Sequence, residues 1–236
     1  MMIKVKYKVL PFFLLLSWQV DAQHTPQTVL LLCKLDSIRN SPSVARHFAG
    51  IYFETTAHAV SHFSSAEPAV QDMMGRMEWR FADYFFRSAD ASKNKTPVSR
   101  EWMAYYSDNN ASSLRYLLLG INAHINGDIW QALTTEFTKE ELEKLKPHYF
   151  SYYTELLKEY RRVSEQAWAQ SKKLRLLHTI SFGMDKWYGK IMLKRWRKRQ
   201  MNLAGLYFTN RSLFEKKLEQ VRRKMIRLEH LIRRNT

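Results

Sequence analysis

The sequence is short of the residues that make turns and of the one that forms disulfides. Its 236 residues include 7 glycines, 6 prolines and one cysteine. Sandwiches and barrels need turn residues at short intervals, so this scarcity argues against an all-β fold and favours long helices. A single cysteine excludes a disulfide framework and a cysteine-rich zinc module. With 45% hydrophobic and 25% charged residues, the composition also excludes intrinsic disorder over most of the length.

The N-terminal apolar run is too short to cross a bilayer, which takes about 20 residues. This run, Leu10–Trp18, follows three lysines and is followed by Val20-Asp21-Ala22. A positive start, a short apolar stretch and small residues at its end are typical of a secretory signal peptide. We therefore predict a signal peptide over residues 1–22 and an exported protein, periplasmic or extracellular, that begins at Gln23. A membrane anchor is the alternative interpretation.

Charge of one sign is concentrated at one end of the chain. From Lys172 onward there are 19 Lys and Arg against 4 Asp and Glu, whereas the residues before it carry 19 against 18. The protein is therefore a nearly neutral body with a basic C-terminal third. We predict an α-helical core domain over residues 23–180 and a basic helical extension over residues 181–236.

Apolar residues recur at helical spacing along the chain, and no β alternation is convincing. The expected fold is all-α: a single compact helical bundle with a basic C-terminal helical pair. A capping box at Thr138–Glu141 marks one helix start. We expect helices near residues 27–39, 43–63, 67–90, 99–107, 111–136, 138–145, 148–178, 184–204 and 211–234.

The segment with the clearest chemistry is the expected helix 111–136. It is apolar around most of its circumference, but His124, Asp128 and Gln131 form a polar stripe on one face, with Asn122 and Asn126 nearby. A helix of this kind is buried, so the stripe points inward. A buried imidazole and carboxylate need partners, because desolvating an unpaired charge is costly.

Two interpretations of the stripe remain open. His124 and Asp128 are four residues apart, so both can reach one divalent ion, such as zinc. The alternative is a structural hydrogen bond between them inside the core. Gly120 and Gly127 lie beside the stripe, and glycines within a helix suggest that another backbone or a ligand approaches closely.

The residues His124-Ile125-Asn126-Gly127-Asp128 resemble the H-x-x-G-D helix motif of the zinc-dependent phospholipase C and single-strand-specific zinc nuclease superfamily. The resemblance implies an all-α fold in which His124 and Asp128 are zinc ligands. The sequence departs from that motif at Ala132, where the motif has proline, and at Thr134, where it has another histidine ligand. At most one or two metal ions fit the remaining pattern.

A broader resemblance starts from the core Gly120–Ile129. It is similar to the G-[IM]-N-A-H-I-N-x-D-L core of an exported bacterial helical family of unknown function. The similarity extends over about residues 27–175 and implies a compact helical fold without an established activity.

A metal bound by His124 and Asp128 would need further ligands from other helices. On the expected helix 43–63, Glu54 and His58 lie on the side opposite the aromatic residues, so this stripe is either solvated or lines a cleft. On the expected helix 67–90 the acidic candidates are Glu78 and Asp83. Asp83 lies among aromatic residues, and we expect it to be the buried one; a salt bridge to a neighbouring arginine is the alternative.

The basic C-terminal third suggests an anionic surface or a phosphate-containing ligand as partner, although a solvated helix face explains the same pattern. No Walker loop and no G-x-G-x-x-G is present, so we expect no nucleotide cofactor. The apolar residues of the expected helix 211–234 form a narrow seam along one face. We expect this seam to pack within the chain, so no oligomer is required. The residues expected to contact the anionic partner are Lys194, Arg195, Arg197, Lys198 and Arg199.

Two functions follow from these features. The first is an exported metal-dependent hydrolase acting on phosphate esters, in which a divalent ion on His124 and Asp128 activates water. The second is a non-catalytic exported helical protein that binds anionic lipid or polyanion through its basic C-terminal helices.

Overall fold

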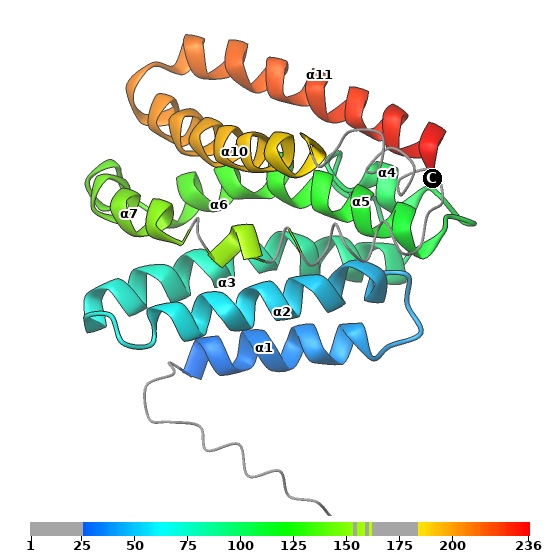
Figure 1. The fold of residues 1–236 in the computed structure, drawn as a ribbon, viewed down its shortest axis with the longest axis horizontal. Helices are drawn as coiled ribbons and strands as arrows, with labels where there is room; N and C mark the ends of the chain where they lie inside the picture. Colours follow the sequence, from blue (N-terminus) through cyan, green and yellow to red (C-terminus); the bar gives the residue numbers. More distant parts are fainter. Residues whose placement is uncertain (1–25, 153–154, 159–160, 162–183) are drawn as a thin grey trace, which may run out of the picture.

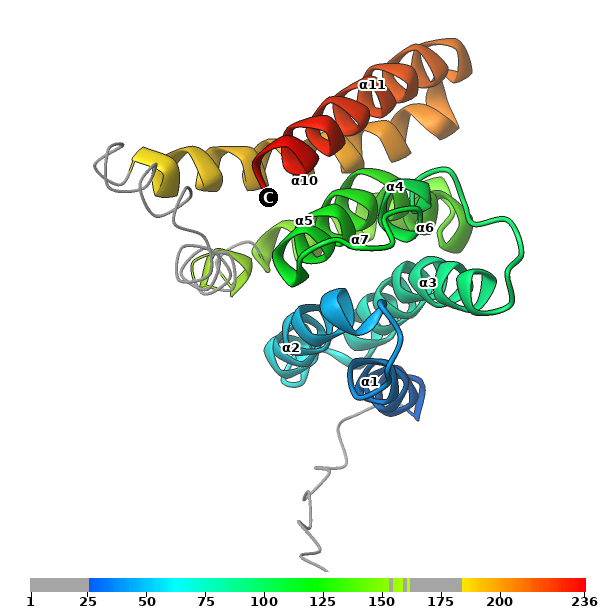
Figure 2. The ribbon, with the colours of Figure 1, turned by 90° about the vertical axis from the view of Figure 1, so that its right-hand side faces the viewer.

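The helices stack in three layers, with a long central rod between an N-terminal and a C-terminal layer (Figure 1 and Figure 2). The structure, a computed structural model, describes residues 26–152, 155–158, 161 and 184–236. Over these residues it contains helices and no strand, which confirms the all-α prediction. No helix in this part is long and apolar enough to span a membrane. The predicted signal peptide and the domain boundary near residue 181 lie outside the described residues.

The N-terminal layer consists of α1 (Pro26–Arg39), α2 (Arg46–Phe63) and α3 (Pro68–Lys93). Proline at the first position opens α3, where its missing N–H costs no hydrogen bond. Helix α2 packs between α1 and α3 and also contacts the central rod. This layer therefore supplies one wall of the interior.

The central rod is a continuous helix made of α5 (Ser113–Ala123), the π-helical turn η1 (His124–Asp128) and α6 (Ile129–Glu136). It corresponds to the expected helix 111–136. The short helix α4 (Met103–Tyr106) lies beside α5, and α7 (Lys139–Ser151) follows α6.

The C-terminal layer is the helix pair α10 (Met184–Thr209) and α11 (Arg211–Asn235), which covers the rod on the side opposite α1–α3 (Figure 2). The apolar seam of α11 is buried against α10 and the rod. The prediction that this seam packs within the chain is therefore confirmed. The buried seam residues are Phe214, Leu218, Val221 and Met225.

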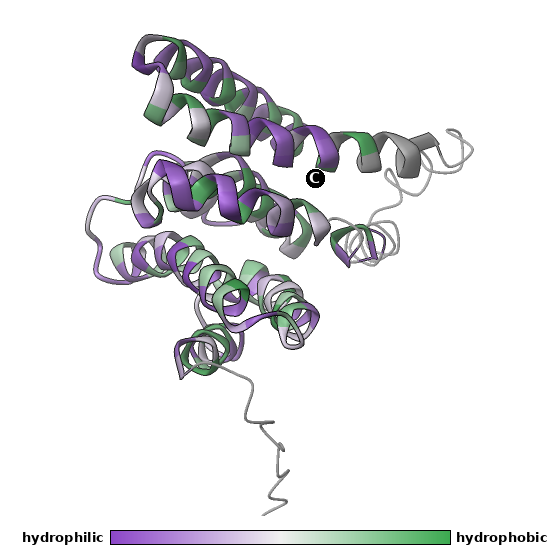
Figure 3. Cartoon of the chain, turned by 90° about the vertical axis from the view of Figure 1, so that its left-hand side faces the viewer, coloured by the Kyte–Doolittle hydropathy of each residue, from purple (hydrophilic) through white to green (hydrophobic). Residues whose placement is uncertain are grey.

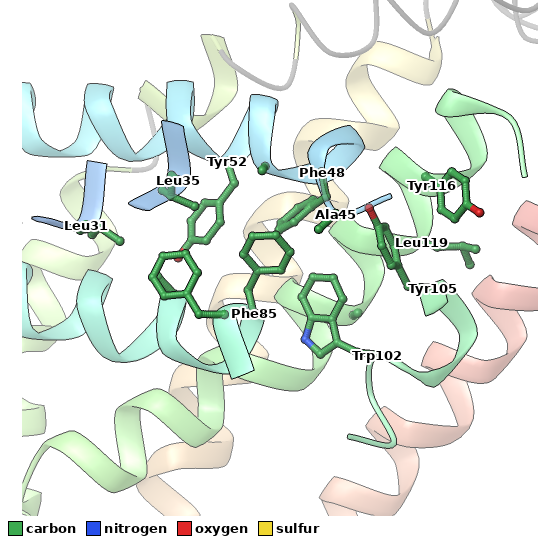
Figure 4. Close-up of a cluster of buried hydrophobic side chains, with 14 residues drawn as sticks. Leu31, Leu35, Ala45, Phe48, Tyr52, Phe85, Trp102, Tyr105, Tyr116 and Leu119 are labelled. Atoms are coloured by element: carbon green, nitrogen blue, oxygen red, sulfur yellow. The ribbon is translucent and has the colours of Figure 1, made fainter. Parts of the chain in front are cut away.

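Aromatic side chains fill the interior between α2, α3, α4 and α5 (Figure 4). Phe48 packs edge-on against Phe85 and Trp102, with ring centroids 5.2 and 5.4 Å apart. Trp102 and Tyr105 are completely buried. Aromatic pairs in such edge-to-face contacts stabilise a core beyond the area they bury.

Several helix boundaries differ from the expected ones. Helix α2 begins at Arg46 because residues 41–45 form hydrogen-bonded turns instead. The expected break at Pro147 is wrong, since α7 continues through it to Ser151. The capping box of α7 at Thr138 and Glu141 is present as predicted. Most of the expected helix 148–178 lies outside the described residues.

Gly120 and Gly127 are needed because side chains, rather than a backbone or a ligand, approach the rod there. A Cβ at Gly120 would lie 2.7 Å from Cγ of Phe48, and a Cβ at Gly127 would lie 2.5 Å from Cγ of Glu101. By contrast, a Cβ at Gly50 on α2 would meet nothing within 4 Å.

Gly120→Ala should lower the free energy of unfolding by about 1–3 kcal/mol, because Phe48 is held by other rings and cannot move aside. The matched control Gly50→Ala should leave stability unchanged or raise it by up to about 1 kcal/mol, the difference in helix propensity. Urea unfolding followed by circular dichroism measures both variants. Equal effects of the two substitutions would show that the contact with Phe48 does not constrain the rod.

Candidate functional site

The central rod changes its hydrogen-bonding pattern at the polar stripe. Residues His124–Asp128 form a π-helical turn between two α-helical segments, η1. Such turns insert one extra residue, are rare, and occur frequently at functional sites. Here the turn coincides with the sequence motif that suggested chemistry.

His124 and Asp128 form a hydrogen-bonded pair. Nδ1 of His124 lies 2.8 Å from Oδ2 of Asp128. The indole Nε1–H of Trp102 donates to both oxygens of Asp128, at 3.0 and 3.2 Å. Donation to both oxygens suits an ionised carboxylate, which accepts at each of them. When Asp128 is ionised, it accepts from Nδ1–H of His124, and the lone pair of the imidazole is then on Nε2.

The imidazole of His124 is enclosed by aromatic rings. It stacks on Phe81 with ring centroids 3.4 Å apart, and the rings of Tyr52 and Phe48 lie at 4.2 and 5.2 Å. His124 is 4% exposed, and its Nε2 has no hydrogen-bond partner among the described residues. Burial lowers the pKa of His124 well below its ordinary value, because the enclosure disfavours the imidazolium. His124 is therefore neutral at pH 7.

Burial raises the pKa of Asp128 well above its ordinary value; the hydrogen bond from Trp102 opposes this increase, and the negative charge of Glu101 adds to it. The indole donor thus stabilises the charged form that burial disfavours. Trp102 precedes α4 and is fully buried, so its position is fixed by the core.

Tyr52 packs against the ring of His124, and Glu78 in turn acts electrostatically on Tyr52. The pKa of Tyr52 is raised, first by burial and then by the negative charges of Glu78 and Asp128. Burial raises the pKa of Glu78 to about 7, and the positive charge of Arg197 opposes this increase. We call His124, Asp128, Tyr52, Glu78 and Arg197 the buried polar centre. Clustered groups with displaced pKa values are characteristic of functional sites.

Arg197 brings a positive charge from the C-terminal layer to this centre. It is 7% exposed, and its guanidinium lies 3.9 Å from the ring centroid of Tyr149. The hydroxyl of Tyr149 donates to the backbone carbonyl of Arg197. The structure therefore does not place Arg197 on the surface where the sequence suggested an anion-binding side chain.

Several buried polar atoms around the centre have no hydrogen-bond partner in the described part of the chain. Because a buried polar atom without a partner is costly, such atoms indicate a bound water or ligand, or a functional role. They come from α2, η1 and α10, so they converge on the interior from different layers. They are Oη of Tyr52, Oγ1 of Thr56, Nε2 of His124, Nε of Arg197, and both amide atoms of Gln200.

The other predicted metal ligands lie elsewhere. Glu54 pairs with Arg39 at 3.5 Å, and His58 is near Glu155. Asp83 forms salt bridges with Arg87 and Arg80 at 2.5 and 3.6 Å. Both Asp83 and Glu78 are half-buried, and the salt bridge to neighbouring arginines, the alternative interpretation of Asp83, is present.

The donor set does not fit a metal held by both His124 and Asp128. Asp128 occupies Nδ1, so only Nε2 of His124 can reach an ion, and Asp128 then orients the ligand from behind. Within the described ranges no three His, Cys, Asp or Glu side chains are grouped so that they could hold a metal ion.

The amides beside the stripe face a different neighbour. Asn122 donates to the carbonyl of Met225 on α11, at 3.1 Å, and Asn126 donates to Asn122. Gln131 donates to the carbonyl of Gly127 on its own helix. Asn122, supported by Asn126, therefore fastens the rod to the C-terminal layer, whereas Gln131 bonds within its own helix.

Sequence reasoning missed the roles of Glu78, Trp102 and Arg197. A signal for Glu78 existed: it lies in the apolar stripe of α3, four residues after Met74 and three before Phe81, where a carboxylate is out of place. No local pattern marked Trp102, and the basic run that marked Arg197 suggested a surface position, since the interior partners of both residues are distant in the sequence.

Comparison of the chain with known proteins identifies a family but no activity. The model of a family described as a family of unknown function, DUF5995, matches residues 32–234. The match includes both helices of the C-terminal layer. No curated protein and no solved structure gives a significant match.

The raised pKa of Glu78 predicts a pH-dependent difference between the protein and its Glu78→Gln variant. Above a pKa of about 4.5 the unfolded chain loses the Glu78 proton, whereas the folded chain retains it up to about pH 7. The stability of the wild type relative to the variant should thus fall as the pH rises from about 4.5 to 7, by an amount on the order of 2 kcal/mol.

Urea unfolding of both proteins at intervals between pH 4 and pH 8 measures this difference. Asp83→Asn, on the same helix but in a surface ion pair, is the matched control and should not show the decline. A constant difference between wild type and Glu78→Gln would mean that Glu78 titrates as an ordinary surface carboxylate.

Proposed function

The chain belongs to the DUF5995 family, and we propose that it is a hydrolase of small phosphate esters whose chemistry takes place at the buried polar centre. One observation carries this proposal. His124 is hydrogen-bonded through Nδ1 to Asp128, while its Nε2 is buried and has no hydrogen-bond partner among the described residues. A carboxylate-oriented neutral imidazole is the arrangement that general bases use.

In the proposed reaction Nε2 of His124 removes a proton from a water molecule, and the water oxygen attacks phosphorus. Glu78, with a pKa of about 7, is protonated in a large fraction of molecules at neutral pH and gives its proton to the leaving alkoxide oxygen. The products are an alcohol and phosphate. The proton gained by His124 and the one lost by Glu78 balance once solvent restores both groups.

Arg197 is suited to bind the anionic group of the substrate. Nε of its buried guanidinium has no hydrogen-bond partner in the part of the chain that the structure describes, and a planar guanidinium matches the geometry of phosphate oxygens. An anion at this position also offsets the cost of burying the positive charge. This support for a phosphate ester comes from the chemistry of the donor alone.

We do not assign a step to a metal ion, because the donor set described above does not fit one. The resemblance to the zinc-dependent phospholipase C motif would instead make His124 a metal ligand. Elemental analysis of protein purified without chelator distinguishes hydrolysis without a metal ion, the form proposed here, from hydrolysis that depends on a bound metal ion. A stoichiometric metal that is lost in His124→Gln would contradict the metal-free form.

Activity should depend on His124 and Glu78 and not on Asp83. With para-nitrophenyl phosphate and bis(para-nitrophenyl) phosphate as substrates, His124→Gln and Glu78→Gln should each lower kcat by about 10²–10⁴-fold, the usual contribution of a general base or acid. Asp83→Asn should retain the wild-type rate. Circular dichroism establishes that each variant is folded.

Two results would contradict the proposal. One is a wild-type protein that hydrolyses neither ester. The other is a folded His124→Gln variant with wild-type activity, which would reduce the His124–Asp128 pair to a structural hydrogen bond.

We also propose that the protein is exported and that its mature form begins at Gln23. The support is the lysine-rich start, the short apolar run and the small residues before the expected cleavage position. Mass spectrometry of the natively produced protein should find Gln23 as the first residue. An intact segment of residues 1–22 in the mature protein would contradict export by this route.

A further inference from the structure

The outer surface of the C-terminal layer carries a large excess of positive charge. Residues 191–236 contain fourteen Lys and Arg against three Glu. Hydrophilic residues follow one another along the ribbons of α10 and α11 (Figure 3). Such an excess either repels itself at a solvated surface or attracts an anionic partner, and the arrangement of the charges decides between the two.

One face of α11 carries lysine and arginine side chains but no acidic residue. One stripe lies next to the buried seam, and all of its side chains are exposed. Its residues follow at intervals of 4-3-4-3-4, which places them on one face of the helix. They are Leu213, Lys217, Gln220, Lys224, Arg227 and Leu231.

The glutamates of α11 do not neutralise this stripe. Glu215 pairs with Arg211 at 2.9 Å, and Glu219 pairs with Arg223 at 3.0 Å. The cations that act on the third glutamate, Glu229, are Arg233, His230 and Arg100. Within the described residues no ion pair involves Lys217, Lys224 or Arg227.

Helix α10 adds a further charge to the same place. The pKa of Lys224 is lowered, and the largest cause is the positive charge of Arg199, followed by burial and then by Lys217 and Arg227. Three cations from two helices are therefore close enough to Lys224 to act on it. We call Arg199, Lys217, Lys224 and Arg227 the basic face.

We propose that the basic face binds the surface of a bilayer that contains anionic lipids. Anionic headgroups would relieve the repulsion that the other three cations exert on Lys224. This inference is independent of the proposed hydrolase activity, because the basic face is on the exposed side of the layer whereas Arg197 points into the interior.

The leucines at the two ends of the stripe favour a lipid surface over a nucleic acid. Leu231 is 55% exposed and Leu213 is 37% exposed. They are separated by 18 residues of helix, or about 27 Å, with the cations between them. Apolar side chains on the charged face of a helix insert into the headgroup region of a membrane, whereas phosphate contacts to nucleic acid do not need them.

Co-sedimentation of the full chain with vesicles tests this proposal. The vesicles contain phosphatidylcholine with or without phosphatidylglycerol. We expect binding to the anionic vesicles alone, weakened at least tenfold by raising the salt from about 50 to about 500 mM, since exposed charges are screened. Lys217→Glu, Lys224→Glu and Arg227→Glu combined should abolish the binding.

A matched control changes the net charge by the same amount elsewhere. Lys93→Glu, Lys139→Glu and Lys144→Glu combined lie on α3 and α7 at exposed positions, and this variant should retain most of the binding. Leu213→Ser with Leu231→Ser should weaken vesicle binding at least threefold. Thermal melts establish that all three variants are folded.

Three outcomes would overturn the proposal. Equal binding by the basic-face and control variants would show attraction by net charge alone. Unchanged vesicle binding after loss of both leucines, together with tighter binding to duplex DNA, would identify a nucleic-acid surface. Failure of the wild type to bind anionic vesicles at low salt would show that the face is solvated only.

Discussion

The hydrogen bonds that join Trp102, Asp128 and His124 determine how the interior is organised. Trp102 holds the carboxylate, and the carboxylate holds the imidazole, so the free nitrogen of His124 has a fixed direction. All three groups are buried, and each would be costly to bury alone. The aromatic core and the π-helical turn are both arranged around this contact, since rings from α2 and α3 enclose His124.

The central rod separates two kinds of polar contact. On one side His124 and Asp128, as members of the buried polar centre, face the aromatic core. On the other side Asn122 fastens the rod to Met225 of α11. Helix α10 contributes to the interior through Arg197 and to the basic face through Arg199. If both proposals hold, a membrane-bound protein would present the layer that contains Arg197 closest to the lipid.

The helices and the buried position of the His124–Asp128 pair follow from periodicity in the sequence, and the structure confirms both. The π-helical turn does not follow from it, because a period of 3.6 residues was assumed throughout. The salt bridges of Asp83 could be anticipated because its arginines are neighbours on α3, whereas the positive charge that acts on Glu78 could not, because it comes from Arg197 on α10, more than 100 residues later.

The protonation state of His124 can be measured directly by ¹⁵N NMR of the imidazole nitrogens, with the signals assigned by their loss in His124→Gln. The hydrogen bond to an ionised Asp128 predicts a neutral ring with the proton on Nδ1 and none on Nε2. Because burial lowers the pKa of His124, this state should persist at least from about pH 8 down to about pH 6. A proton on Nε2, or an imidazolium at neutral pH, would contradict this expectation. In either case Nε2 would lack the lone pair with which it would act as a general base.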